Sequence, residues 1–188
     1  MIALKYNGNE YEIKNEANEL LVGQFEKLSE ILNDETNDRV ESYIKVFTEL
    51  GIPGEVIDSM DYDDFIKIIR QLNLSDVLEN EYKQEIKIGD YTYTSYEGDT
   101  FKLKVKDMSL IETCVKSNPN RYIGELLAVL FKRTDLSKVE HYDKEHLKHK
   151  AKLFRSNVTA DVAIPFIVYF SDKLIKNIKN IASDGQSV

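Results

Sequence analysis

Two histidines in the last third of the chain have a spacing that metal ligands can use. His146 and His149 lie three residues apart, so a helix would place both imidazoles on one face, and Glu145 lies four residues before His149. Zinc sites need three or four ligands, whereas the one cysteine, Cys114, is distant in sequence and His141 falls in the preceding loop. The glutamate also precedes the first histidine instead of following it as in HExxH. We therefore predict no metal site here.

An acidic cluster offers oxygen atoms that hard cations prefer. Asp61, Asp63 and Asp64 lie within four residues of one another. A calcium-binding EF-hand needs ligands that alternate over about 12 residues, a central glycine and a closing glutamate, and this segment lacks that pattern. Acidic residues are also stabilised at the start of a helix by the helix dipole. The cluster is therefore interpreted as a helix start and not as a cation site.

Nucleophilic and nucleotide-dependent chemistry have no sequence support. Cys114 lies beside Leu110 and Ile111 on the apolar face of an expected helix, which is typical of a small buried hydrophobic residue. The chain contains no GxSxG, P-loop or GxGxxG motif. The glycines are mostly interpreted as turns and caps: Gly8, Gly23, Gly51, Gly54, Gly89, Gly98 and Gly124. We predict no catalytic residue and no cofactor, and hence a non-enzymatic protein.

Length and composition indicate an ordinary globular protein. The chain has 188 residues, of which 42% are hydrophobic and 31% are charged. One cysteine excludes an intramolecular disulfide, and the first residues do not resemble a signal peptide, so a reducing cytoplasm is expected. The longest apolar stretch, 160–170, is half of the roughly 20 residues that span a bilayer. No membrane span is predicted.

Charge is distributed unevenly along the sequence. The net charge is −8, but residues 1–100 contain 9 basic and 23 acidic residues, whereas residues 101–188 contain 16 basic and 10 acidic ones. The acidic half would repel a phosphate backbone, so nucleic-acid binding by the whole protein is disfavoured. The basic half could meet an acidic partner or the acidic half of its own chain, or its charges could simply be solvated.

The first 80 residues are predicted to form a hairpin followed by helices. Asn7-Gly8 separates two short runs of aromatic and branched residues, which favours a type I′ hairpin. Apolar residues then recur every three or four positions and predict helices over about 17–32, 38–50, 54–60 and 61–72. A polar, acidic stretch follows, and we predict a domain boundary near residue 80.

Residues 81–188 are predicted to contain strands and then a helical bundle. Strands are expected at 86–88 and 91–94, and a third at 101–106, in which Phe101, Leu103 and Val105 face the core and the intervening lysines face water. The N-terminal hairpin could join this sheet. Helices are expected near 107–115, 119–131, 143–154 and 160–181, with Pro165 either in a first turn or at a kink. The predicted fold class is helix-rich α+β with a small antiparallel sheet, as two domains (1–80 and 81–188) or as one compact unit.

The run at 162–170 is apolar on all sides of its expected helix. Such a helix is either buried in the protein's own core or docked on a partner. The leading candidates for partner contact are four residues of this run: Val162, Phe166, Tyr169 and Phe170. The basic helix at 144–155 is the corresponding candidate for phosphate contact.

Six short segments follow one another along the chain: Tyr-Glu-Ile at 11–13, Leu-Leu-Val-Gly-Gln-Phe at 20–25, Gly-Ile-Pro at 51–53, Tyr-Ile-Gly-Glu-Leu-Leu-Ala-Val-Leu at 122–130, His-Tyr-Asp at 141–143 and Lys-Leu-Phe-Arg at 152–155. In this order they resemble tailed-bacteriophage assembly proteins, above all tail assembly chaperones and T-even-like baseplate hub assembly proteins. The resemblance extends over residues 1–178 as a pattern of apolar and polar positions with a few identities.

This resemblance implies a role without catalysis. The protein would hold a phage tail or baseplate protein until assembly, in the host cytoplasm, and no cofactor or catalytic residue follows from these families. Two alternatives remain open. One is a structural subunit of the virion, in the baseplate, tail or neck, and the other is a phosphate- or nucleic-acid-binding regulator that uses the basic C-terminal half. The sequence does not define the oligomeric state.

Overall fold

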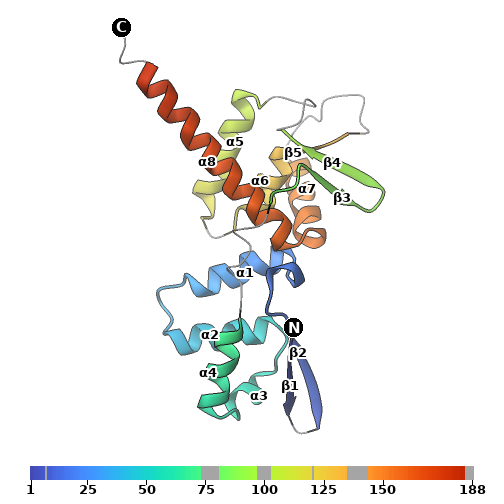
Figure 1. The fold of residues 1–188 in the computed structure, drawn as a ribbon, viewed down its shortest axis with the longest axis vertical. Coiled ribbons are helices and arrows are strands. Elements are labelled where there is room, and N and C mark those ends of the chain that lie inside the picture. Colours follow the sequence, from blue (N-terminus) through green and yellow to red (C-terminus); the bar gives the residue numbers. More distant parts are fainter. Residues whose placement is uncertain (7, 73–80, 97–102, 120, 135–143, 185–188) are drawn as a thin grey trace.

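The computed structural model describes residues 1–6, 8–72, 81–96, 103–119, 121–134 and 144–184, with side chains described up to residue 175. The described part is a helix-rich α+β fold with two small antiparallel sheets, which confirms the predicted fold class. The N-terminal elements form one end of the molecule and the C-terminal elements form the other, with α1 (Val22–Leu32) between them (Figure 1).

The two predicted strands of the N-terminal hairpin are present and paired, and the type I′ turn between them stays a prediction. β1 (Ile2–Tyr6) pairs antiparallel with β2 (Asn9–Ile13), and Tyr6 lies opposite Asn9. Gly8 has φ +77°, a conformation that glycine adopts without the steric cost of a Cβ atom. Asn7 lies outside the described residues. The hairpin forms a two-stranded sheet of its own and does not join the second sheet, although the sequence allows that pairing.

Helices cover the rest of the N-terminal half in the predicted order. A short 3₁₀ turn (Ala17–Glu19) precedes α1, and α2 (Arg39–Glu49), α3 (Gly54–Asp58) and α4 (Tyr62–Gln71) follow. Asp38 caps α2 because its side chain accepts a hydrogen bond from the Glu41 amide at 2.8 Å. Phe47 and Phe65 meet edge to face at 5.5 Å in the core that these helices share with the hairpin.

The described residues of the C-terminal half form a three-stranded sheet packed with four helices. β3 (Glu85–Ile88), β4 (Tyr91–Ser95) and β5 (Phe131–Arg133) lie in that order and pair antiparallel. The helices are α5 (Val105–Ser117), α6 (Ile123–Leu130), α7 (Lys144–Asn157) and α8 (Ala160–Asp184). Every residue of α6 except Glu125 is buried, so this helix is the centre of the larger core.

The third strand of this sheet lies elsewhere than the sequence pattern predicts. α5 already begins at Val105, which is 88% exposed, and Leu103 is half-buried, while residues 101 and 102 lie outside the described part. The Lys104 amide donates a hydrogen bond to the Asp107 carboxylate at 2.8 Å, which stabilises a helix start two residues before the predicted one. The strand that pairs with β4 instead begins at Phe131, which the apolar periodicity places in the preceding helix.

The last helix continues through Pro165 as one segment of 25 residues, Ala160–Asp184. Its C-terminal part extends away from the other helices (Figure 1). No helix in the described part of the chain is both long and apolar enough to cross a bilayer.

The segment that precedes α1 is hydrogen-bonded to the segment that connects α7 to α8. The Val22 amide donates to the Val158 carbonyl and the Ala160 amide donates to the Leu20 carbonyl, each at 2.8 Å. Val22 belongs to the core around α6, whereas Leu28, one and a half turns later, packs with Val46 of α2. α1 therefore contributes to both halves, and the division near residue 80, within a segment outside the described residues, stays a prediction.

Candidate functional site

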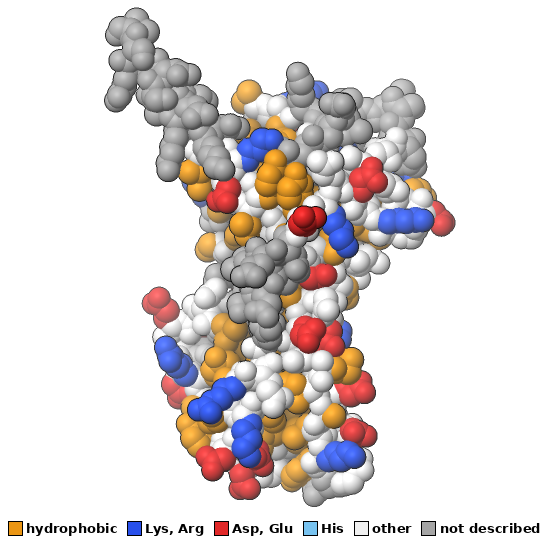
Figure 2. Space-filling model, viewed as in Figure 1, with side chains coloured by type: hydrophobic (Ala, Val, Ile, Leu, Met, Phe, Trp, Pro, Cys, Tyr) orange, Lys and Arg blue, Asp and Glu red, His pale blue; other side chains and the backbone are white. Residues whose placement is uncertain are grey.

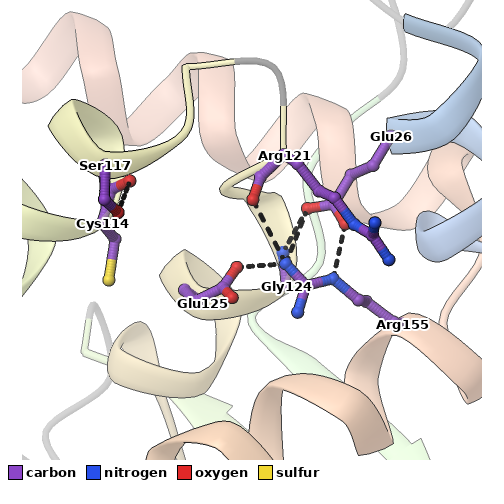
Figure 3. Close-up of polar contacts among 7 residues, drawn as sticks. All are labelled: Glu26, Cys114, Ser117, Arg121, Gly124, Glu125 and Arg155. Atoms are coloured by element: carbon purple, nitrogen blue, oxygen red, sulfur yellow. Dashed lines mark hydrogen bonds and ion pairs between the residues drawn. The ribbon is translucent and has the colours of Figure 1, made fainter. Parts of the chain in front are cut away.

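A fully buried carboxylate lies where α1 meets α6 and α7. Glu26 on α1 is 0% exposed, although glutamate is rarely buried completely unless it is paired. Its Oε1 accepts a hydrogen bond from the Gly124 amide at 2.9 Å, and its Oε2 accepts one from the Arg155 Nε at 2.5 Å (Figure 3). The carboxylate thus connects an N-terminal helix to two helices that lie about a hundred residues further along the chain.

Arg155 is the centre of the polar network. Its Nη2 donates to Glu125 on α6 and to the Arg121 carbonyl, the latter at 3.3 Å (Figure 3). Burial alone would lower the pKa of this guanidinium, but hydrogen bonds and attraction from Glu26 and Glu125 outweigh it and raise that pKa above its usual value. Arg155 therefore stays charged, and two carboxylates surround it.

Two glycines allow Arg155 to lie between the helices. A Cβ atom at Gly124 would lie 2.8 Å from Cγ and 2.9 Å from Nε of Arg155, and a Cβ at Gly23 would lie 3.3 Å from the Arg155 Cβ. Both glycines lie within helices, so the interpretation of most glycines as turns and caps does not hold for these two. A glycine inside an expected helix was the sequence signal that another group approaches the backbone closely.

The chemistry of this network suits positioning better than proton transfer. The guanidinium only donates hydrogen bonds, and both oxygens of Glu26 already accept them. The pair also joins the acidic half of the sequence to the basic half, which is one of the roles considered for the charge asymmetry. We therefore interpret the network as a polar clamp that sets the relative positions of α1, α6 and α7.

Cys114 lies near this network on α5 and is half-buried (Figure 3). Burial raises the pKa of its thiol, and the negative charge of Glu125 raises it further, while Arg155 partly opposes both effects. A raised pKa keeps the group as a neutral thiol near pH 7, which is a weak nucleophile. The geometry gives no support for an activated catalytic cysteine.

The other polar candidates from the sequence are dispersed. His146 and His149 are exposed on α7, and His141 lies outside the described residues. Asp61 and Asp63 are exposed, and Asp64 pairs with Lys67 at 2.7 Å. In the part of the chain that the structure describes, no three His, Cys, Asp or Glu side chains form a group that could hold a metal ion.

The basic residues of α7 have two different environments. Lys144, Lys148 and Lys152 are exposed. Lys150 is buried and donates to the Phe131 carbonyl at 2.6 Å, and Arg155 belongs to the clamp. Since two basic side chains are used inside the protein, the helix presents less positive charge to a phosphate backbone than its sequence suggests.

The four residues expected to contact a partner divide between core and surface. Phe166 is 0% and Phe170 is 4% exposed, and the Phe166 ring lies 4.5 Å from the Phe131 ring, centroid to centroid. Val162 and Tyr169 are half-buried, and the Tyr169 ring stacks on Tyr82 at 3.9 Å. Phe166 and Phe170 are therefore buried in the protein's own core, which was the alternative to partner contact. Contact of this run with a partner stays a prediction.

The side of α8 that faces solvent carries a different set of apolar residues. Val168 is 38% and Ile175 is 50% exposed, while Ile164, one turn before Val168, is half-buried and packs against the protein's own core. The spacings of four and seven residues place these three side chains in one row. The sequence could not identify this row, because the run is apolar on every side and gives no preferred inner face.

Comparisons with protein-family models, with curated proteins and with solved structures found no match to this chain.

Proposed function

We propose that this protein is a non-enzymatic assembly factor of a tailed bacteriophage that holds another tail or baseplate protein before assembly. The phage context comes from the resemblance of the six sequence segments between residues 11 and 155. The observation that supports the binding role is the α8 row, which we define as Ile164, Val168 and Ile175; Val168 and Ile175 are exposed, and Ile164 packs against the core at the inner end of the row.

The α8 row has the properties of a surface that needs a partner. Its side chains are branched and apolar and lie one to two turns apart on α8, the helix whose C-terminal part extends beyond the other elements (Figure 1). Hydrophobic side chains also gather elsewhere in the upper half of the molecule, with charged side chains around them (Figure 2). An amphipathic helix of a partner could bury such a row by packing along it.

The buried aromatic residues support this role indirectly. Phe166, Phe170 and Phe131 anchor α8 to the core, so the outer row is held on a fixed helix. A fixed surface loses less conformational entropy on binding than a mobile one. The charge difference between the two halves would then orient the partner without adding much affinity.

The experiment that tests this proposal is co-expression of the tagged full chain with the tail and baseplate proteins of its phage, followed by affinity capture. The double variant Val168→Asp/Ile175→Asp should capture less than about a tenth of the wild-type amount, because two charges would be buried at the contact. Val40→Asp is the matched control, since Val40 is 45% exposed on α2, far from the row in sequence.

Three results would contradict the proposal. If the folded double variant captured as much partner as the wild type, α8 would not be part of the contact. If Val40→Asp lost as much capture as the double variant, the effect would be non-specific. Recovery of the chain at fixed stoichiometry in purified particles would favour the alternative of a structural virion subunit.

A further inference from the structure

A pocket of about 590 Å³ lies between α5, α6 and α7, separate from the α8 row. Its volume falls within the range of about 300–1,000 Å³ that is typical of small-molecule sites. The pocket is bounded by one face of each of two helices, and Glu125 of α6 lies between them. It therefore has the size of a ligand site.

Helical spacing explains how α5 lines the pocket. Lys106, Leu110, Cys114 and Ser117 follow one another at intervals of three or four residues and lie on one face. At 1.5 Å per residue, this face runs for about 16 Å along the helix. A ligand can therefore contact a lysine at one end and the thiol and hydroxyl groups at the other.

One part of the pocket lining is apolar. Leu110 of α5 and Leu147 of α7 line it, and Leu147 is only 8% exposed. Cys114 adds a neutral thiol, which behaves as a small apolar group. Such a lining favours a hydrocarbon segment and excludes a highly hydrated ion.

The charge around the pocket is positive. Lys106, Lys144 and Lys148 line it, and Glu125, the acidic residue that the structure places in its lining, is already paired with Arg155. Lys148 also contacts Glu145 at 3.0 Å, but this pair is exposed, and exposed pairs are worth little, so the lysine can turn to a ligand at small cost. An anionic group is therefore attracted to this site.

From these features we infer that the pocket binds an anion with an apolar tail, of the class of medium-chain carboxylic acids. The carboxylate lies among the lysines and the tail lies along Leu110, Cys114 and Leu147. This site does not depend on the assembly role, because it uses helices other than α8.

The sole cysteine of the chain provides a direct test. Octanoate is titrated into the full-length protein, and the rate of alkylation of Cys114 by iodoacetamide is measured by mass spectrometry, with calorimetry as a second readout. Octanoate should slow alkylation in a saturable way and should release heat with the same midpoint. Absence of both effects up to about 10 mM octanoate would overturn the inference.

Charge variants and an uncharged analogue test the recognition of the anion. Lys144→Glu/Lys148→Glu should weaken octanoate binding by about tenfold or more, because attraction becomes repulsion. Lys152→Glu, an exposed residue of the same helix that does not line the pocket, should bind as the wild type does. 1-Octanol, which has the same tail and no charge, should bind about tenfold more weakly than octanoate. Equal binding of the two compounds, or equal losses in all the lysine variants, would contradict the assigned ligand class.

Discussion

Glu26 and Arg155, which lie 129 positions apart in the sequence, form an ion pair in which the carboxylate is completely buried. Because the two residues are so far apart in the sequence, the pair forms only when α1 lies against α7 with the correct rotation. The Glu26 carboxylate, which is 0% exposed, depends on its hydrogen-bond donors to compensate its charge. The pair therefore contributes to the specificity of the arrangement as well as to its stability.

The first prediction concerns the loss of the carboxylate charge. Glu26→Gln should destabilise the protein by about 3 kcal/mol, because Arg155 would stay charged and keep only Glu125 as a counter-ion. Glu30→Gln, an exposed change on the same helix, should alter the free energy of unfolding by less than about 0.5 kcal/mol. Urea unfolding followed by circular dichroism measures both values. Equal stability of the two variants would mean that the buried pair contributes nothing.

The second prediction concerns the glycine against which Arg155 lies. Gly124→Ala should cost about 1–3 kcal/mol, because the new methyl group would clash with an arginine that its two carboxylates hold in place. Gly54→Ala, also in a helix but with no atom within 4 Å of its new Cβ, should be neutral or stabilising by up to about 1 kcal/mol.

A double-mutant cycle separates this clash from helix propensity. In an Arg155→Ala background, Gly124→Ala should lose its cost, because the conflicting side chain is gone. An unchanged cost in that background would show that the methyl group conflicts with something other than Arg155.

Local patterns predicted most elements of this fold, and long-range contacts explain the errors. The Asn7-Gly8 turn and the helix start after Asp38 depend on neighbouring residues, and the structure has the expected hairpin and helix. Phe131 reads as the last apolar residue of a helix, and only its pairing with Ser95 makes it the first residue of a strand. The run 101–106 alternates like a strand, yet Asp107 starts a helix from Lys104 onward.

The clamp could not be predicted from the sequence for the same reason. Nothing near Glu26 distinguishes it from the other glutamate of the same helix, Glu30, and Arg155 reads as one more basic residue of a basic helix. The glycines at 23 and 124 were the available signals, because a glycine within a helix costs up to about 1 kcal/mol relative to alanine and so indicates a close approach. That Arg155 is the group next to both glycines follows only from the packing of three helices.

The third prediction concerns the ionisation of Cys114. Glu125→Gln removes a negative charge near the thiol, so the pKa of Cys114 should fall towards its usual value and alkylation at pH 7 should become faster. Glu112→Gln, on the exposed side of the same helix, should leave the rate unchanged. The pH profile of the alkylation rate gives the pKa of Cys114 in the wild type and in each variant. An unchanged profile in Glu125→Gln would mean that burial alone raises the pKa.

The same pKa shift predicts how stability depends on pH. The folded protein holds the thiol proton more tightly than the unfolded chain, whose thiol has a pKa of about 8.5. The resulting stabilisation is complete below that value and is lost as the pH rises through the higher pKa of the folded state. Cys114→Ser should remove this part of the alkaline change, which unfolding measurements from neutral to alkaline pH would detect. Identical curves for wild type and variant would contradict the linkage.

The fourth prediction distinguishes core from contact surface within the apolar run of α8. Phe166→Ala should cost about 3–5 kcal/mol, because the ring is fully buried against Phe131 and would leave a cavity. Tyr169→Ala should cost about 1–2 kcal/mol, since this half-buried ring loses mainly its stacking on Tyr82. Urea midpoints at constant slope measure both. If Phe166→Ala unfolded at the wild-type midpoint and yet failed to capture the tail or baseplate protein that we propose as partner, Phe166 would belong to the interface, and its ring could not be part of the core beside Phe131.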